Sequence, residues 1–192
     1  METKLLLKAE DGWKKIFEPD QIVRSITRIA HEILENNKGG VDLAIVGVRT
    51  RGEFLAERLV GKIKEIENID IPLGIVDITL YRDDLAHTPE QPIVRGTVLP
   101  FNVDHMVIVL VDDVLFTGRT VRAAIDAIID FGRPRKVQLA VLCDRGHREL
   151  PIRADYVGKN ISTMRADKIQ VLLSERDGED AIYKKEAKTN NN

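Results

Sequence analysis

One stretch of the sequence decides the fold, and it reads Ile108-Val109-Leu110-Val111-Asp112-Asp113-Val114-Leu115-Phe116-Thr117-Gly118-Arg119-Thr120. The apolar residues 108–111 predict a buried strand, and the apolar spacing over 121–131 predicts a helix. Between the two stand adjacent carboxylates and a turn of small residues. Because ligands of open α/β sheets bind beyond the carboxyl ends of the strands, we expect a site here.

The turn Thr117-Gly118-Arg119-Thr120 predicts a phosphate site. The start of the following helix offers backbone N–H groups and the positive end of the helix dipole, which both suit a phosphate. The nucleotide-binding pattern G-x-x-x-x-G-K-[ST] is absent from the stretch. Asp112 and Asp113 would accept hydrogen bonds from sugar hydroxyls, whereas a helix cap alone would need one carboxylate. The stretch therefore indicates a sugar-phosphate site.

Bulk properties set limits on the kind of protein. The 192 residues suit one domain spanning 1–192, and the net charge of −2 gives no global attraction to nucleic acid, so an RNA surface would have to be local. The lone Cys143 excludes an internal disulfide. No apolar run is long enough for a signal peptide or a membrane span, so we expect a cytoplasmic protein without membrane contact.

Apolar runs and apolar spacing alternate along the chain. The predicted helices are 22–36, 52–66 and 121–131, and the predicted strands are 43–48, 71–80, 106–111, 136–142 and 169–173. This alternation predicts an α/β fold with a mostly parallel sheet and helices on both faces. Residues 1–18 and 184–192 are expected to be loosely ordered.

At this point the sequence resembles a known family. Residues 108–120 look like the phosphoribosyl-pyrophosphate (PRPP) signature of the type I phosphoribosyltransferases. Further stretches are similar to the bacterial family that combines pyrimidine-operon regulation with uracil phosphoribosyltransferase activity, and they are Ser25–Glu32, Val46–Gly52, Asp77–Leu85 and Asp144–Tyr156. The resemblance implies the type I phosphoribosyltransferase fold, with a small hood beside the main sheet. It also implies transfer of a phosphoribosyl group from PRPP to uracil, giving UMP and diphosphate.

The resemblance assigns roles to the residues of the opening stretch. It implies that Asp112 and Asp113 are catalytic and bind the ribose hydroxyls, either directly or through Mg²⁺, the expected cofactor. Such an ion would bridge the ribose hydroxyls and the pyrophosphate oxygens. The 5′-phosphate would be held by Thr117, Gly118, Arg119 and Thr120.

A second loop, Arg49-Thr50-Arg51-Gly52, again stands where a strand meets a helix. Arginine forks and backbone amides suit a pyrophosphate, although an exposed turn with two solvated arginines is the alternative. The resemblance implies that Arg49, Thr50 and Arg51 bind pyrophosphate, and that this loop can carry a non-proline cis peptide. Arg82 opens a long loop that in the family closes over PRPP and excludes water, and we take it as a further catalytic contact.

The resemblance places the uracil base under the segment that begins with Cys143, Asp144 and Arg145. The edge of uracil carries two carbonyls and an N–H, which backbone groups of residues 141–147 would match.

Regulatory members of the family bind a stem-loop in leader mRNA when a uridine nucleotide, UMP or UTP, is bound. Candidate RNA-binding residues are Thr27, Arg28, His31, Arg145, Arg148 and Lys159. If the basic residues of 145–168 lie beside the first helix, they form a local patch for RNA phosphates and loop bases. A solvated amphipathic helix explains the first three residues equally well.

Three functions therefore stand side by side. The leading hypothesis is a Mg²⁺-dependent uracil phosphoribosyltransferase that also regulates pyrimidine genes through leader mRNA. The second is an RNA-binding nucleotide sensor with little catalysis, and the third is a phosphoribosyltransferase for hypoxanthine or guanine. The resemblance also implies a homodimer or a higher homo-oligomer.

Overall fold

The computed structural model describes residues 12–79 and 96–187, and within these ranges no helix has the length and apolar character that a membrane span requires. The elements are, in chain order, β1 (Trp13–Phe17), α1 (Pro19–Asn36), β2 (Leu43–Val48), α2 (Arg51–Glu67), β3 (Leu73–Val76), β4 (Val107–Leu115), α3 (Arg119–Ile129), β5 (Lys136–Asp144), β6 (Tyr156–Asn160), β7 (Lys168–Leu172), α4 (Ser174–Asp177) and β8 (Ala181–Lys185).

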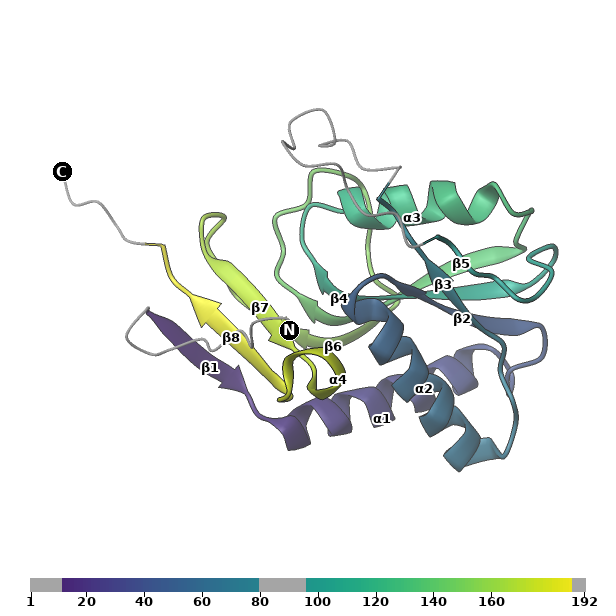
Figure 1. Ribbon diagram of the computed structural model, residues 1–192, viewed down its shortest axis with the longest axis horizontal. Helices are drawn as coiled ribbons and strands as arrows, with labels where there is room; N and C mark the ends of the chain where they lie inside the picture. Colours follow the sequence, from purple (N-terminus) through teal and green to yellow (C-terminus); the bar gives the residue numbers. More distant parts are fainter. Residues whose placement is uncertain (1–11, 80–95, 188–192) are drawn as a thin grey trace.

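The main sheet has five parallel strands in the order β3-β2-β4-β5-β6. Helices α1 and α2 cover one face of it, and α3 covers the other (Figure 1). This arrangement confirms the α/β fold predicted from the alternation of strands and helices. The order places β4 at the centre, so its carboxyl end is surrounded by the ends of β2 and β5.

The central strands are apolar along their length because both faces of the sheet are covered. All six residues of β2 are buried. Alternate side chains enter opposite cores: Ile45 and Val109 pack with residues of α1 and α2, whereas Ala44 and Ile108 pack with residues of α3. The continuous apolar runs in the sequence are thus explained by a sheet that is buried on both faces.

A second sheet, antiparallel and three-stranded, has the order β1-β8-β7. It corrects two expectations. The strand predicted at 169–173 belongs to this sheet and not to the parallel one, and the ends of the chain contribute ordered strands at Trp13–Phe17 and Ala181–Lys185. The reason is long-range pairing, such as Lys15 opposite Tyr183, which orders two short segments that lie near the ends of the chain.

Strand β4 continues beyond the predicted end at residue 111. Its pairing with β5 runs from Val107 opposite Lys136 to Leu115 opposite Asp144. Asp112 and Asp113 therefore lie inside a strand, where the backbone of β5 holds one side of them. The predicted helix at 121–131 is observed over Arg119–Ile129, so it begins within the turn 117–120 that the sequence marks as a phosphate site.

Candidate functional site

The two loops predicted to bind phosphate meet at the carboxyl end of the parallel sheet. Strands β2 and β4 are neighbours, with Gly47 opposite Val111. The backbone of Gly52 lies so close to β4 that a Cβ there would meet the carbonyl oxygen of Val111 and would lie 3.3 Å from the Cα of Asp112. Only glycine allows this approach, and it brings the loop 49–52 against the acid pair.

The acid pair is held by its own backbone. The Asp112 carboxylate accepts the N–H of Asp113 at 2.9 Å, and the Asp113 carboxylate accepts the N–H of Val114 at 2.9 Å. Asp112 is only 6% exposed. Burial raises the pKa of both carboxyls, and the neighbouring charge of Asp113 raises the pKa of Asp112 further.

The charge of Arg51 makes the pKa values of the two acids differ. It lowers the pKa of Asp113 against the larger, opposite effect of burial, and within residues 12–79 and 96–187 no cation has such an effect on Asp112. Asp113 is therefore the member that ionises more readily, and Asp112 the member that more readily keeps its proton.

The loop between β2 and α2 contains a cis peptide bond between Arg49 and Thr50. The Arg49 guanidinium lies 3.4 Å from the Glu53 carboxylate, while its Nε is buried with no hydrogen-bond partner among the described residues. A buried N–H donor without a partner is rare and costly, so it favours an acceptor supplied by a ligand. The predicted pyrophosphate loop thus has a donor that suits an anionic oxygen.

The predicted 5′-phosphate turn is the N-terminus of α3. Gly118 is the N-cap residue, with φ +93°, a conformation that L side chains rarely adopt. The carbonyl of Thr117 accepts the N–H groups of Glu149 and Leu150 at 2.9 and 3.1 Å, so the loop after β5 braces the turn. Arg119 donates to the Glu149 carboxylate at 2.8 Å, and Thr120 is exposed in the first turn of the helix.

The residues predicted to bind the base lie where β5 ends, beside the acid pair. Cys143 is fully buried, and burial raises the pKa of its thiol, as do the charges of Asp113 and Asp144. The thiol is therefore held in its neutral form. The Asp144 carboxylate accepts the N–H of Gly146 at 2.9 Å and pairs with Arg148. These side chains shape the loop, so a base would meet mainly its backbone.

The structure places Arg145 in the interior and not on an RNA surface. Its guanidinium lies 4.1 Å from the centroid of the Phe116 ring and donates to the carbonyls of Met164 and Arg165. Arg148 likewise donates to the carbonyls of Phe116 and Ile152. Both arginines hold the loops of the site together, which leaves them poorly placed for RNA phosphates.

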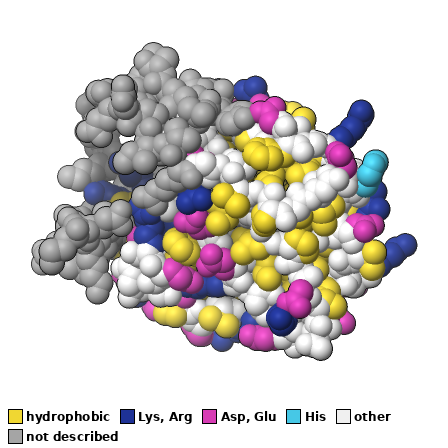
Figure 2. Space-filling model, turned by 45° about the vertical axis from the view of Figure 1, so that its right-hand side comes forward, with side chains coloured by type: hydrophobic (Ala, Val, Ile, Leu, Met, Phe, Trp, Pro, Cys, Tyr) yellow, Lys and Arg dark blue, Asp and Glu magenta, His cyan; other side chains and the backbone are white. Residues whose placement is uncertain are grey.

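The remaining RNA candidates lie on α1 and β6, two elements that contact each other. Arg28 donates to the carbonyls of Val157 and Gly158 at 2.9 and 2.8 Å and pairs with Glu32, so the helix lies beside β6. His31 on α1 and Lys159 on β6 are exposed. The hydroxyl of Thr27 donates to its own helix. On the described part of the face in Figure 2, by comparison, basic and acidic side chains are interspersed.

Arg82, predicted to contact pyrophosphate, lies outside the described residues. One residue beside the site that the sequence did not single out is Asp177, which accepts two hydrogen bonds of 3.1 and 2.9 Å from Arg51. The acidic turn Ser174–Asp177 carries no recognisable motif, and only the fold brings it to the site.

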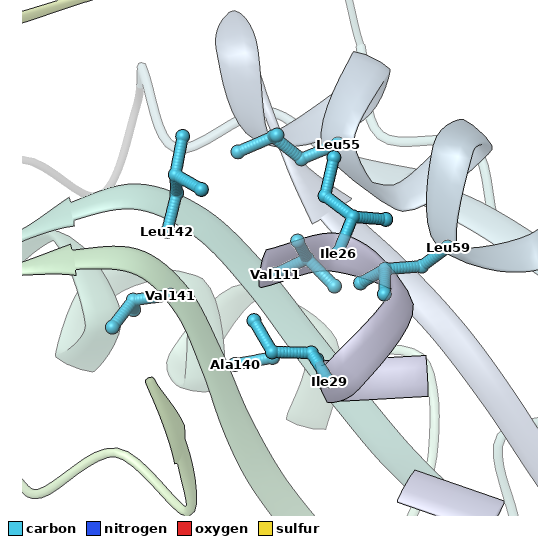
Figure 3. A pocket seen from close by; sticks show the side chains of 8 residues that line it. All are labelled: Ile26, Ile29, Leu55, Leu59, Val111, Ala140, Val141 and Leu142. Atoms are coloured by element: carbon cyan, nitrogen blue, oxygen red, sulfur yellow. The ribbon is translucent and has the colours of Figure 1, made fainter. Parts of the chain in front are cut away.

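The internal cavity shown in Figure 3 is too small and too apolar to be an alternative ligand site. This cavity has a volume of about 10 Å³ and lies between α1, α2 and the central strands. Its lining is apolar, and its residues are Ile26, Ile29, Leu55, Leu59, Val111, Ala140, Val141 and Leu142. A space of this size holds one water at most, and without polar partners it stays dry.

Comparisons with known proteins agree with this geometry. The sequence matches the phosphoribosyl transferase domain family over residues 12–175. A relative named "Bifunctional protein PyrR" from Pelotomaculum thermopropionicum is 61% identical over 168 residues, which cover 88% of this chain and 93% of the relative. A protein of the same name from Clostridioides difficile is 58% identical over 172 residues, covering 90% and 97%.

Among solved structures, a hypoxanthine-guanine phosphoribosyltransferase from Bacillus anthracis is similar with a TM-score of 0.66 at 16% identity. The match covers 90% of this chain and 97% of that one. A likeness at this identity shows a shared fold, which agrees with the type I phosphoribosyltransferase fold expected from the sequence.

The close approach at Gly52 predicts the effect of adding a single methyl group. Gly52→Ala should lower the free energy of unfolding by about 1–3 kcal/mol, because the backbone of β4 has to move away. Gly61→Ala is the matched control on the same helix, where no atom lies within 4 Å. It should stabilise by about 0.5–1 kcal/mol. Urea unfolding of both variants measures this, and equal changes would contradict the close packing.

The buried acid pair predicts a stability that depends on pH. Burial raises the folded pKa of Asp112 above its unfolded value of about 3.9, so ionisation favours unfolding and stability falls as pH rises above that value. Asp112→Asn should therefore raise the melting temperature at pH 7, and the gain should vanish near the unfolded pKa. Asp70→Asn, at an exposed carboxylate, is the control. A gain of the same size at both pH values would refute the assignment.

Proposed function

This chain belongs to the phosphoribosyltransferase family and, within it, to the group of bifunctional PyrR proteins, and from that premise we propose that it transfers the phosphoribosyl group of PRPP to uracil. The observation that carries the proposal is the acid pair on β4, which lies between two turns suited to phosphate. A ribose with a phosphate at each end matches this arrangement of charges.

In the proposed reaction, N1 of uracil forms a bond to C1′ of the ribose while the bond from C1′ to the pyrophosphate oxygen breaks. The proton on N1 passes to solvent water, and positive charge develops on the sugar ring in the transition state. The Asp113 carboxylate, kept more acidic than Asp112 by Arg51, stabilises that charge. A covalent intermediate with the protein is not needed.

The two ends of PRPP would bind on opposite sides of the acid pair. The backbone amides and hydroxyls of Thr117, Gly118, Arg119 and Thr120 take the 5′-phosphate at the start of α3. Arg49, Thr50 and Arg51 take the pyrophosphate, and the buried Nε of Arg49 supports this assignment because it needs an acceptor. The family resemblance assigns a further pyrophosphate contact to Arg82, which lies outside the described residues.

The donor set also suits Mg²⁺. The described residues contain no cluster of three or more carboxylate, histidine or cysteine groups that would form a cage of protein ligands. Mg²⁺ is commonly held by one or two carboxylates together with substrate phosphates, and Asp112 and Asp113 provide this number. When bound, the ion supplies positive charge to the departing pyrophosphate.

We further propose that the chain binds a leader mRNA stem-loop when UMP or UTP occupies the site. The hydrogen bonds from Arg28 to β6 support this second activity, because they join the two elements that carry the candidates Thr27, Arg28, His31 and Lys159. The predicted homo-oligomer stays a prediction. A nucleotide sensor with little catalysis would use the same surface, so turnover decides between the two functions.

Turnover of uracil tests the enzyme directly. Purified protein with PRPP and Mg²⁺ should form UMP, and Asp113→Asn should lower kcat by about 100-fold or more, because transition-state charge is no longer stabilised. Asp126→Asn, on the exposed side of α3, is the control. Hypoxanthine and guanine serve as competing acceptors in the same assay. Preferred turnover of a purine would refute uracil as the substrate, and an absence of turnover would favour the sensor.

The RNA surface predicts a salt-dependent weakening of binding. His31→Ala combined with Lys159→Ala should weaken binding of a leader stem-loop and reduce the slope of log K against log salt by about one for each RNA phosphate that is no longer neutralised. UMP formation should not change. Lys136→Ala, at the first residue of β5, is the control. Arg28→Ala is less suitable as a test because Arg28 also joins α1 to β6. An unchanged affinity and slope would show that the RNA lies elsewhere.

A further inference from the structure

The guanidinium of Arg51 is held by Asp177 of α4, which connects β7 and β8 of the second sheet. Its Nε and Nη2 donate to the two carboxylate oxygens of Asp177, at 3.1 and 2.9 Å. Both side chains are largely buried, with 20% of Arg51 and 6% of Asp177 exposed. A bidentate pair of this kind sets the plane of the guanidinium as well as its position.

Asp177 is itself locked in place. Its Oδ2 accepts the backbone N–H of Leu173 at 3.0 Å, and its own N–H donates to the Leu173 carbonyl at 2.7 Å. Leu173 is fully buried in the core that α1 and α2 share with the sheet. The carboxylate therefore cannot follow Arg51 if that side chain moves, and it acts as a fixed anchor.

The pair leaves part of the guanidinium available. Of the five N–H donors of arginine, the two hydrogen bonds to Asp177 use two, on Nε and Nη2. Among the described residues, Nη1 has no hydrogen bond that competes with a ligand. The loop that carries Arg51 packs against β4, where Gly52 meets the backbone of Val111, and the charge of Arg51 lowers the pKa of Asp113.

Stability alone does not account for such a pair. Two charges taken out of water lose much of their solvation, and replacing a buried ion pair by apolar residues is often neutral or stabilising. An arginine that is already oriented, however, loses less entropy when it binds a phosphate. Orientation of Arg51 is therefore the role that this geometry supports.

We propose that Asp177 is a positioning residue, which orients Arg51 so that its remaining donors face the pyrophosphate of PRPP. This inference rests on the proposed function and extends it to the second sheet. That sheet, through the turn between β7 and β8, then sets the affinity for PRPP without touching it.

A neighbouring ion pair provides the control. Arg58, two helical turns after Arg51 on α2, donates to the carboxylates of Glu175 and Asp180. It ties α2 to the same segment, beside a groove of about 460 Å³ that includes Val23 of α1, away from the acid pair. Glu175→Gln therefore loosens the same turn without changing Arg51.

The experiment measures PRPP binding by calorimetry with Mg²⁺ present and no base acceptor. Asp177→Asn, which keeps an acceptor for the Leu173 N–H, should weaken binding by about 10- to 100-fold, whereas Glu175→Gln should bind like the wild type. Asp177→Glu, which keeps the charge, should recover part of the loss. In steady-state assays the KM for PRPP should rise and the KM for uracil should not.

A double-mutant cycle decides whether Asp177 acts through Arg51. Asp177→Asn should add nothing to the loss caused by Arg51→Ala, and additive losses would overturn the inference. Equal binding by wild type and Asp177→Asn would overturn it as well. If Asp177→Asn does not fold, Arg51→Lys, which lacks the fork, should lose similar affinity, and full affinity would overturn the inference. A wild type that binds no PRPP would instead refute the proposed function itself, and the inference with it.

Discussion

The site depends on two adjacent carboxylates inside a strand, of which Asp112 is buried and Asp113 half-buried. Backbone pairing between β4 and β5 continues as far as Leu115 and Asp144, so Asp112 and Asp113 are held by the sheet and not by a loop. The cost of this arrangement appears in the pKa of each acid, which burial raises. Rigid, poorly solvated carboxylates stabilise a developing positive charge better than mobile, hydrated ones, because little reorganisation is needed when the charge forms. Burial of the carboxylates therefore lowers the folding stability but leaves the site already organised for the developing charge.

The rest of the molecule supports that pair from three sides. Gly52 lets the loop 49–52 contact β4 directly, and Gly118 starts α3 at the turn proposed to bind the 5′-phosphate. The loop after β5 closes the third side, where Arg145 and Arg148 donate to carbonyls of neighbouring loops. Arginines that look like a nucleic-acid patch in the sequence thus serve as internal supports, and the candidate RNA surface is reduced to α1 and β6.

Much of the fold follows from local sequence. The apolar run of β2 predicts a strand that is buried on both faces. The spacing of apolar residues in α1 predicts a helix that is buried on one face. The local pattern ends β4 too early, since aspartates are depleted in strands and the pairing that extends the strand comes from β5. The same pattern misses β6 and assigns β7 to the wrong sheet, because short strands are defined by their partners.

The sequence by itself determined the chemistry of the site: the tandem acids, the small-residue turn and the arginine loop occur in local order, and with them the family. Tertiary structure alone decided which charges are exposed and which are buried, and it brought Asp177 to Arg51 from 126 residues away. The physical reason is that local sequence restricts backbone conformation and carries charge. Contacts between distant side chains depend on how the two sheets pack.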